Sequence, residues 1–150
     1  MTEIRFVDDL AEFVSLVDLT DIAPVEVRAA RLTGTVLPSE AELEAGNQIY
    51  RRIDDNSVEI RIVSTVVSEE ARLTVDVLVR YEKLEPFDCS DLVLQEFTQR
   101  IGLLAGYPYV RETIADLSMR LRIPPVTLGI MRSGDIQFTP LSSADTKETP

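Results

Sequence analysis

The chain has 150 residues, 45% of them hydrophobic, and a formal net charge of −11. This size and hydrophobic content fit one domain with a packed core, whereas the acidic balance excludes the basic surface that nucleic-acid binding needs. The absence of histidine and the presence of a single cysteine, Cys89, exclude histidine catalysis, a zinc site and an intrachain disulfide. Acidic residues on both sides of Cys89 are expected to raise the pKa of its thiol and to make it a poor nucleophile.

The N-terminal sequence and the hydropathy pattern predict a cytoplasmic protein that does not enter a membrane. The first ten residues, MTEIRFVDDL, lack the positively charged start and the apolar run of a secretion signal. No apolar stretch approaches the length of a membrane span. Residues 1–150 are therefore predicted to form one domain with an N-terminal helix (1–20), a core (25–131) and a polar, disordered tail (140–150).

The first predicted element is an amphipathic helix near the N-terminus, because apolar residues recur there at helical spacing. The stripe consists of Phe6, Leu10, Phe13, Val14 and Val17. Acidic residues between them suit a solvent-facing side, and Pro24 is expected to mark the break that follows the helix.

Four strands are predicted after this break, since apolar and polar residues alternate over short runs. The first covers residues 25–37, and its apolar phase slips near Ala29, which predicts a bulge in a strand at the sheet edge. The second and weaker strand covers 48–55. The third and fourth, 57–67 and 71–81, alternate cleanly and are joined by the short link SEE, so they are expected to form a hairpin in an antiparallel sheet with one dry face.

The period then changes to that of two helices. Ser90 or Asp91 is expected to cap the first helix, and the run GLLAG is expected to end or kink it. Its apolar stripe is Leu94, Phe97, Ile101 and Leu104. The second helix is expected to start at Pro108, because a first helical position does not need the missing N–H, and to stop before Pro124 and Pro125. Its apolar stripe is Val110, Ile114, Leu117 and Leu121.

This order of elements predicts an α+β fold, with a four-stranded antiparallel sheet, helices packed on one face and an extra N-terminal helix. Acidic pairs such as Asp54/Asp55 and Glu69/Glu70 lie where turns are predicted and are interpreted as solvated. The six glycines form no phosphate-binding loop, and no loop has calcium-binding spacing. The residues therefore predict no catalytic group, no metal and no other cofactor.

One stretch around the second helix resembles a known family. The run Tyr107-Pro108-Tyr109-Val110-Arg111-Glu112-Thr113-Ile114, followed at the expected distance by Pro124-Pro125-Val126-Thr127-Leu128, is similar to the motif of the SecB chaperones. The hairpin and the helix upstream match that family's order of elements, and the likeness extends over residues 25–131. The sequence is most similar to the actinobacterial SecB-like branch, which includes the chaperones of toxin–antitoxin–chaperone systems and has an extra N-terminal helix.

The resemblance implies a homotetramer, built as a dimer of dimers, that binds unfolded polypeptides in long apolar grooves without nucleotide or metal. Sheet edges would pair within each dimer, and the motif helices would be sandwiched between the sheets. The residues assigned on this basis to the oligomer interface or to the structural motif are Pro108, Tyr109, Val110, Arg111, Glu112, Ile114, Leu117, Leu121, Pro124 and Pro125.

The predicted function is that of an ATP-independent holdase for unfolded or nascent polypeptides, including preproteins in protein export. Its affinity would come from apolar burial in shallow, multivalent grooves. The residues predicted to contact clients lie at strand ends and around the double proline. They are Tyr50, Tyr81, Leu84, Phe87, Ile123, Val126, Leu128 and Met131.

Two alternatives to a general export chaperone stay open. One is a dedicated chaperone of an antitoxin, which would use the same grooves. The other is a small carboxylate-dependent enzyme such as a hot-dog-fold thioesterase, which the order of elements and the missing site chemistry disfavour.

Docking of the export motor SecA is a further implication of the resemblance, and it depends on the charge of the outer sheet face. In export-dedicated members the motor docks on acidic residues of that face. Glu59 and Asp76 offer such charge in this sequence, but Arg61, Arg72 and Arg80 interrupt it.

Overall fold

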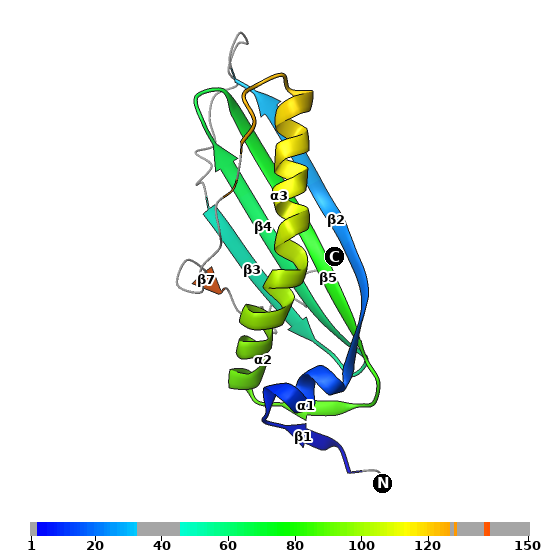
Figure 1. The fold of residues 1–150 in the computed structure, drawn as a ribbon. Helices are drawn as coiled ribbons and strands as arrows, with labels where there is room; N and C mark the ends of the chain where they lie inside the picture. Colours follow the sequence, from blue (N-terminus) through cyan, green and yellow to red (C-terminus); the bar gives the residue numbers. More distant parts are fainter. Residues whose placement is uncertain (1–2, 33–45, 127, 129–136, 139–150) are drawn as a thin grey trace, which may run out of the picture.

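The computed structural model describes residues 3–32, 46–126, 128 and 137–138, so the predicted tail at 140–150 lies outside the described residues (Figure 1). Its elements follow the chain in this order: β1 (Arg5–Val7), α1 (Leu10–Ser15), β2 (Val17–Arg31), β3 (Gly46–Ile53), β4 (Ser57–Val67), β5 (Ala71–Lys83), β6 (Phe87–Cys89), α2 (Asp91–Phe97), η1 (Thr98–Gly102), α3 (Leu103–Arg120) and β7 (Gln137–Phe138). A long sheet carries α3 along one face, and β1, α1, β6 and α2 lie together at one end of it.

The predicted four-stranded antiparallel sheet is confirmed, with the strand order β2-β5-β4-β3. β4 and β5 form the predicted hairpin, and β2 is the edge strand that the sequence analysis expected. The two-residue β7 adds to β3 in the parallel sense, and β1 pairs with β6 in a separate parallel sheet. These short strands were not predicted, because two or three residues carry no readable periodicity.

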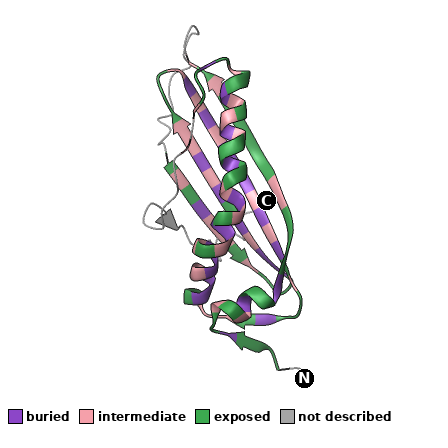
Figure 2. Ribbon diagram, in the orientation of Figure 1, coloured by how far each residue is buried: buried purple, intermediate pink, exposed green. Residues whose placement is uncertain are grey.

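The alternation in β4 and β5 places one apolar face of the sheet under α3. Ile60 and Ile62 of β4 lie opposite Val79 and Val77 of β5. All four side chains are at most 1% exposed. Figure 2 shows the same pattern as a buried band along the middle of the sheet, beneath the helix. The expected packing of helices on one dry face is therefore confirmed.

The N-terminal helix is shorter than predicted and is flanked by strands. α1 begins after Asp9, whose carboxylate accepts the backbone N–H of Glu12 at 3.0 Å, and it ends at Ser15. Phe6 lies before it in β1, and Val17 lies after it in β2. The predicted stripe thus combined residues of three elements. The ladder of hydrogen bonds between β2 and β5 outweighs a weak helical preference in residues 17–20.

The predicted break at Pro24 is wrong, because β2 continues through it. Proline is tolerated there since β2 is an edge strand, where an N–H is not needed on the outer side. The bulge expected near Ala29 is also displaced. The register shifts instead between Leu19 and Asp21 and between Pro24 and Glu26, so the second irregularity directly follows the proline.

The two predicted helices form one continuous helical segment, in which α2 leads through the π-helical turn η1 into α3. Pro108 consequently lies inside α3 and not at a helix start. The glycines of the predicted break lie against the sheet. A Cβ atom on Gly102 would lie 2.1 Å from Cδ1 of Ile60, and one on Gly106 would lie 2.7 Å from Cδ1 of Ile62. These glycines allow close contact between helix and sheet and do not end the helix.

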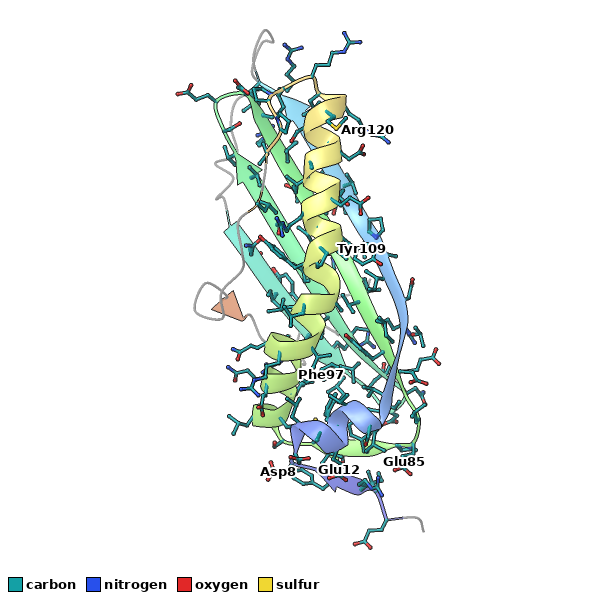
Figure 3. The ribbon with its side chains drawn as sticks, viewed as in Figure 1. Asp8, Glu12, Glu85, Phe97, Tyr109 and Arg120 are labelled. Atoms are coloured by element: carbon teal, nitrogen blue, oxygen red, sulfur yellow. The ribbon has the colours of Figure 1, made fainter. Side chains whose placement is uncertain are left out.

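An aromatic cluster joins the end of the molecule to the sheet. The ring centre of Phe97 in α2 lies 4.4 Å from that of Phe13 in α1 and 4.9 Å from that of Tyr81 in β5 (Figure 3). Phe87 of β6 lies 5.2 Å from Phe13. None of the four side chains is more than 5% exposed. The cluster therefore connects two helices and two strands through a single buried contact region.

Candidate functional site

α3 ends in a Schellman motif, which turns the chain back along the helix. The N–H of Ile123 donates to the carbonyl of Ser118 at 3.1 Å, and the N–H of Arg122 donates to that of Met119 at 3.1 Å. Ile123 is only 9% exposed. The stretch that follows, here called the proline segment (residues 123–126 and 128), is held at this end by the buried isoleucine.

A shallow groove of about 280 Å³ lies between α3 and the proline segment. It is lined by Pro108, Arg111, Glu112, Ala115, Val126 and Leu128. Val126 and Leu128 are half-buried and pack against the core, while Arg111 and Glu112 are exposed. Neither of these two charged residues forms an ion pair within the described part of the chain. The groove is smaller than usual small-molecule pockets and suits one or two apolar side chains of a larger partner.

A second apolar surface lies on the opposite side of α3. The register places Leu19 and Val27 of β2 next to Tyr81 and Val75 of β5, on the sheet face that carries the helices. α3 lies over β4 and β5, so β2 extends beyond its cover (Figures 1 and 2). Leu19 and Val27 are 49% and 41% exposed, and Tyr109, 48% exposed, lies on the side of α3 that faces β2 (Figure 3). We call this surface the β2 strip.

Two acidic residues on the outer face of the sheet, Asp76 and Glu59, are paired with arginines. Asp76, only 4% exposed, accepts hydrogen bonds from Nε of Arg61 at 3.2 Å and from its Nη2. The hydrogen bond to Asp76 raises the pKa of Arg61. Glu59 accepts from Nη1 of Arg80 at 2.7 Å. These two carboxylates therefore do not form a free acidic patch.

Comparisons with known proteins agree with this geometry. No protein-family model matches the chain. The SecB-like chaperone SmegB of Mycolicibacterium smegmatis is 25% identical over 132 residues, which span 88% of this chain and 87% of that protein. Among solved structures, the Mycobacterium tuberculosis Rv1957 SecB-like chaperone, in complex with a ChAD peptide from the Rv1956 HigA1 antitoxin, has the same fold. The two structures share a TM-score of 0.62 and 21% identity, over 81% of this chain and 92% of that one.

The chain is similar to SecB-like chaperones in sequence and in fold. The resemblance carried by the Tyr-Pro-Tyr run and the double proline is thereby confirmed. Both relatives are named as chaperones, which agrees with the prediction of a protein that is not an enzyme. Within its described residues, the chain has no group of three or more metal-binding side chains, and none of its helices has the length and apolarity of a membrane span.

The structure places the predicted client-contacting residues in different environments. Val126 and Leu128 line the groove, and Leu84 is 59% exposed at the end of the sheet. Tyr50 is half-buried on the outer sheet face, and its hydroxyl donates to Oε1 of Gln48 at 2.8 Å.

Three further residues are not accessible in the described chain, which corrects the expectation that strand ends would expose them. Tyr81 and Phe87 belong to the aromatic cluster, because the end of the molecule folds over the strand ends. Ile123 anchors the proline segment. Met131 lies outside the described residues.

The residues of the family motif also fall into distinct places. Val110 and Ile114 are fully buried against the sheet of the same chain, so they contribute to the core. Leu117 and Leu121 are half-buried beside them. The exposed members of the motif line the groove, belong to the β2 strip or form the double proline. They are Pro108, Tyr109, Arg111, Glu112, Pro124 and Pro125.

Cys89 behaves as the sequence predicts, although for a different main reason. Burial is the largest cause that raises the pKa of its thiol. Asp91 and Asp88 raise it further, and Lys83 opposes them. The half-buried thiol is therefore a weak nucleophile.

The turn after α3 contains strain that a substitution should release. Arg122 has a φ angle of 55°, a left-handed conformation that favours glycine. Arg122→Gly is therefore expected to raise the free energy of unfolding by about 0.5–1 kcal/mol. Arg120→Gly is the matched control, because it makes the same change inside the last helical turn and also removes the ion pair with Asp116 (2.9 Å). It is expected to lower stability by about 1 kcal/mol. Urea titrations that gave both variants the same sign would contradict this interpretation.

Proposed function

We propose that this protein is an ATP-independent holdase chaperone in the cytoplasm that binds unfolded or nascent polypeptides. One observation carries the proposal. A chain similar to named chaperones leaves two apolar surfaces, the groove and the β2 strip, uncovered on either side of α3. Neither surface contains a set of side chains suited to a covalent step.

Binding would come from the burial of apolar side chains, worth about 25 cal/mol per Å² before the cost of ordering the client is subtracted. An unfolded client loses much conformational freedom when it binds. Several shallow contacts along one chain offset that cost better than one deep pocket. The charges of Arg111 and Glu112 at the groove keep its rim hydrated while its walls stay apolar.

The assembly we propose is a homotetramer. β2 is a 15-residue edge strand, and no strand of the described chain pairs with its outer side. Such an edge needs a partner or a cover, and pairing between the β2 edges of two chains would supply one. Native mass spectrometry tests the stoichiometry directly, and a single subunit at micromolar concentration would argue against the assembly.

Two kinds of client remain to be distinguished, namely preproteins in export and an antitoxin. A solved structure with the same fold is that of a SecB-like chaperone in complex with an antitoxin peptide, which favours the antitoxin. The paired carboxylates Asp76 and Glu59 provide little free charge for docking of the SecA motor. Purification from the native host followed by mass spectrometry would decide. One small co-purifying partner supports the antitoxin role, whereas many preproteins support export.

A substitution that fills the groove should weaken client binding. Ala115 lines the groove from α3, and Ala115→Arg introduces a long side chain with little loss of helix propensity. We expect the affinity for reduced, cysteine-blocked and fluorescently labelled lysozyme to fall by about tenfold, since the burial of one large apolar side chain contributes about 1.5–3 kcal/mol. Fluorescence anisotropy without nucleotide measures the change, and suppression of aggregation of a diluted, denatured enzyme should fall in parallel.

Leu104→Arg is the control for this experiment. Leu104 is 73% exposed on the same helix and does not line the groove. Its substitution adds the same charge and should leave the affinity within about twofold of the wild type, as expected of a surface change. Equal losses in both variants would indicate a general charge effect and would remove the groove from the proposal.

A further inference from the structure

Ser118 is a fully buried polar residue on the face of α3 that packs against the core. Its Oγ donates to the carbonyl of Ile114 at 2.9 Å and accepts the backbone N–H of Val126 at 3.2 Å. A hydroxyl group can do both at once, because it has one donor and two acceptor sites. The hydrogen bond to Val126 joins the last turn of α3 to the proline segment, eight residues later in the chain.

The hydrogen bond from Val126 to Ser118 uses the first backbone N–H that follows the double proline. Pro124 and Pro125 have no N–H, so Val126 carries the first backbone donor after Ile123. The N–H of Ile123 is already used in the Schellman motif. Removal of the Ser118 hydroxyl would therefore take away the hydrogen bond that ties the N–H of Val126 to α3.

Thr98 provides a useful comparison within the same helical unit. Its side chain is also fully buried, and its Oγ1 donates to the carbonyl of Leu94 at 2.7 Å. This is the same bond to the residue four positions earlier that Ser118 makes, and such a bond adds little stability to a helix. Ser118 differs in that it also accepts a hydrogen bond from outside the helix.

We infer that Ser118 is a positioning residue for the groove. By holding the N–H of Val126 against α3, it fixes Val126, and with it Leu128, as the wall that faces Pro108 and Ala115. The inference rests on the proposed function, since it assigns to Ser118 the shape of the surface that binds the client. This positioning role differs from a role in stability alone, because the fully buried Ile114 and Val110 already pack α3 against the core.

The test uses the 150-residue chain and its variants Ser118→Ala and Thr98→Val. Each removes a buried hydroxyl and its bond within the helix, but only the first frees the N–H of Val126. In the absence of client, amide hydrogen exchange at Val126 should become about 5- to 30-fold faster in Ser118→Ala and stay unchanged in Thr98→Val. The affinity for the labelled unfolded lysozyme should fall by about fivefold or more in Ser118→Ala only. Ser118→Thr retains the hydroxyl and should restore both readouts.

Each outcome decides one part of the inference. Unchanged exchange at Val126 in Ser118→Ala would show that the bond does not hold the segment. Faster exchange with wild-type affinity would show that the held segment does not shape the binding surface. Equal losses of affinity in Ser118→Ala and Thr98→Val would reduce the effect to stability, which thermal unfolding of both variants measures. A wild-type protein that binds no unfolded lysozyme would overturn the proposed function, while the exchange data would still decide the role of Ser118 in holding the segment.

Discussion

Phe97→Ala is expected to lower the free energy of unfolding by about 3–5 kcal/mol, the range for removing a fully buried phenylalanine. Phe97 is 0% exposed, and its ring contacts those of Phe13 and Tyr81. Its removal leaves a cavity where α1, α2 and β5 meet, and it removes two aromatic contacts in addition to buried area. Urea titrations followed by circular dichroism measure the change. All samples are kept at the same protein concentration, because the apparent stability of an associating protein depends on concentration.

Phe6→Ala is the matched control for this prediction. The chemical change is the same, but Phe6 is 63% exposed in β1. Its substitution is expected to alter stability by less than about 0.5 kcal/mol. A large loss in Phe6→Ala would mean that its side chain is covered in the assembled protein, whereas a small loss in Phe97→Ala would contradict the role of the aromatic cluster in joining the end of the molecule to the sheet.

Gly106→Val should lower the free energy of unfolding by about 1–3 kcal/mol through overpacking. A Cβ atom at this position would lie 2.6 Å from Cγ2 of Val79 and 2.7 Å from Cδ1 of Ile62. Val79 is β-branched and fully buried, so it cannot move aside without disturbing β5. The substitution would push α3 away from the sheet, although valine is intrinsically a better helix former than glycine.

Met119→Val on the same helix separates overpacking from helix propensity. Met119 is 69% exposed, so the new side chain meets no sheet residue, and stability should stay within about 0.5 kcal/mol of the wild type. Thermal unfolding of both variants provides the comparison. If Gly106→Val were as stable as Met119→Val, the close contact between helix and sheet would not be the reason for glycine at position 106.

The periodic elements of the chain could be predicted because their patterns are long and local. The alternation in residues 57–67 and 71–81 matches β4 and β5, and its inner face is the one that α3 covers. The acid at Asp9 and the serine at Ser90 are both helix caps, of which the second was predicted by position. The family motif was also readable, since several of its residues occur at set spacing.

The predictions of a break at Pro24 and of a helix end at the glycines of GLLAG were wrong for a common reason. Each was argued from the local preference of a residue, whereas residues distant in the sequence decided the outcome. Pro24 is tolerated because its strand lies at the edge of the sheet. Gly102 and Gly106 are required by Ile60, Ile62 and Val79, which lie more than 20 residues away.

The candidate site was only partly readable for the same reason. Val126 and Leu128 could be named because they follow the double proline, but the pairing of Val126 with Ser118 depends on how the chain turns after α3. Tyr81 and Phe87 resemble exposed strand-end aromatics in the sequence, yet the folded end of the molecule covers them. Ser118 gave no signal at all, since a serine in a helix is usually a surface residue.

By itself, the sequence determined the α+β class, the strong hairpin, the helical stripes and the likeness to SecB, because each of these depends on residues close together in the chain. The tertiary structure alone decided which apolar residues stay accessible. Leu19 and Val27 are as hydrophobic as Val75 and Val79, but they lie on a strand that α3 does not reach, so they stay exposed while the others are buried. Accessibility depends on what covers a residue, and no local pattern records that.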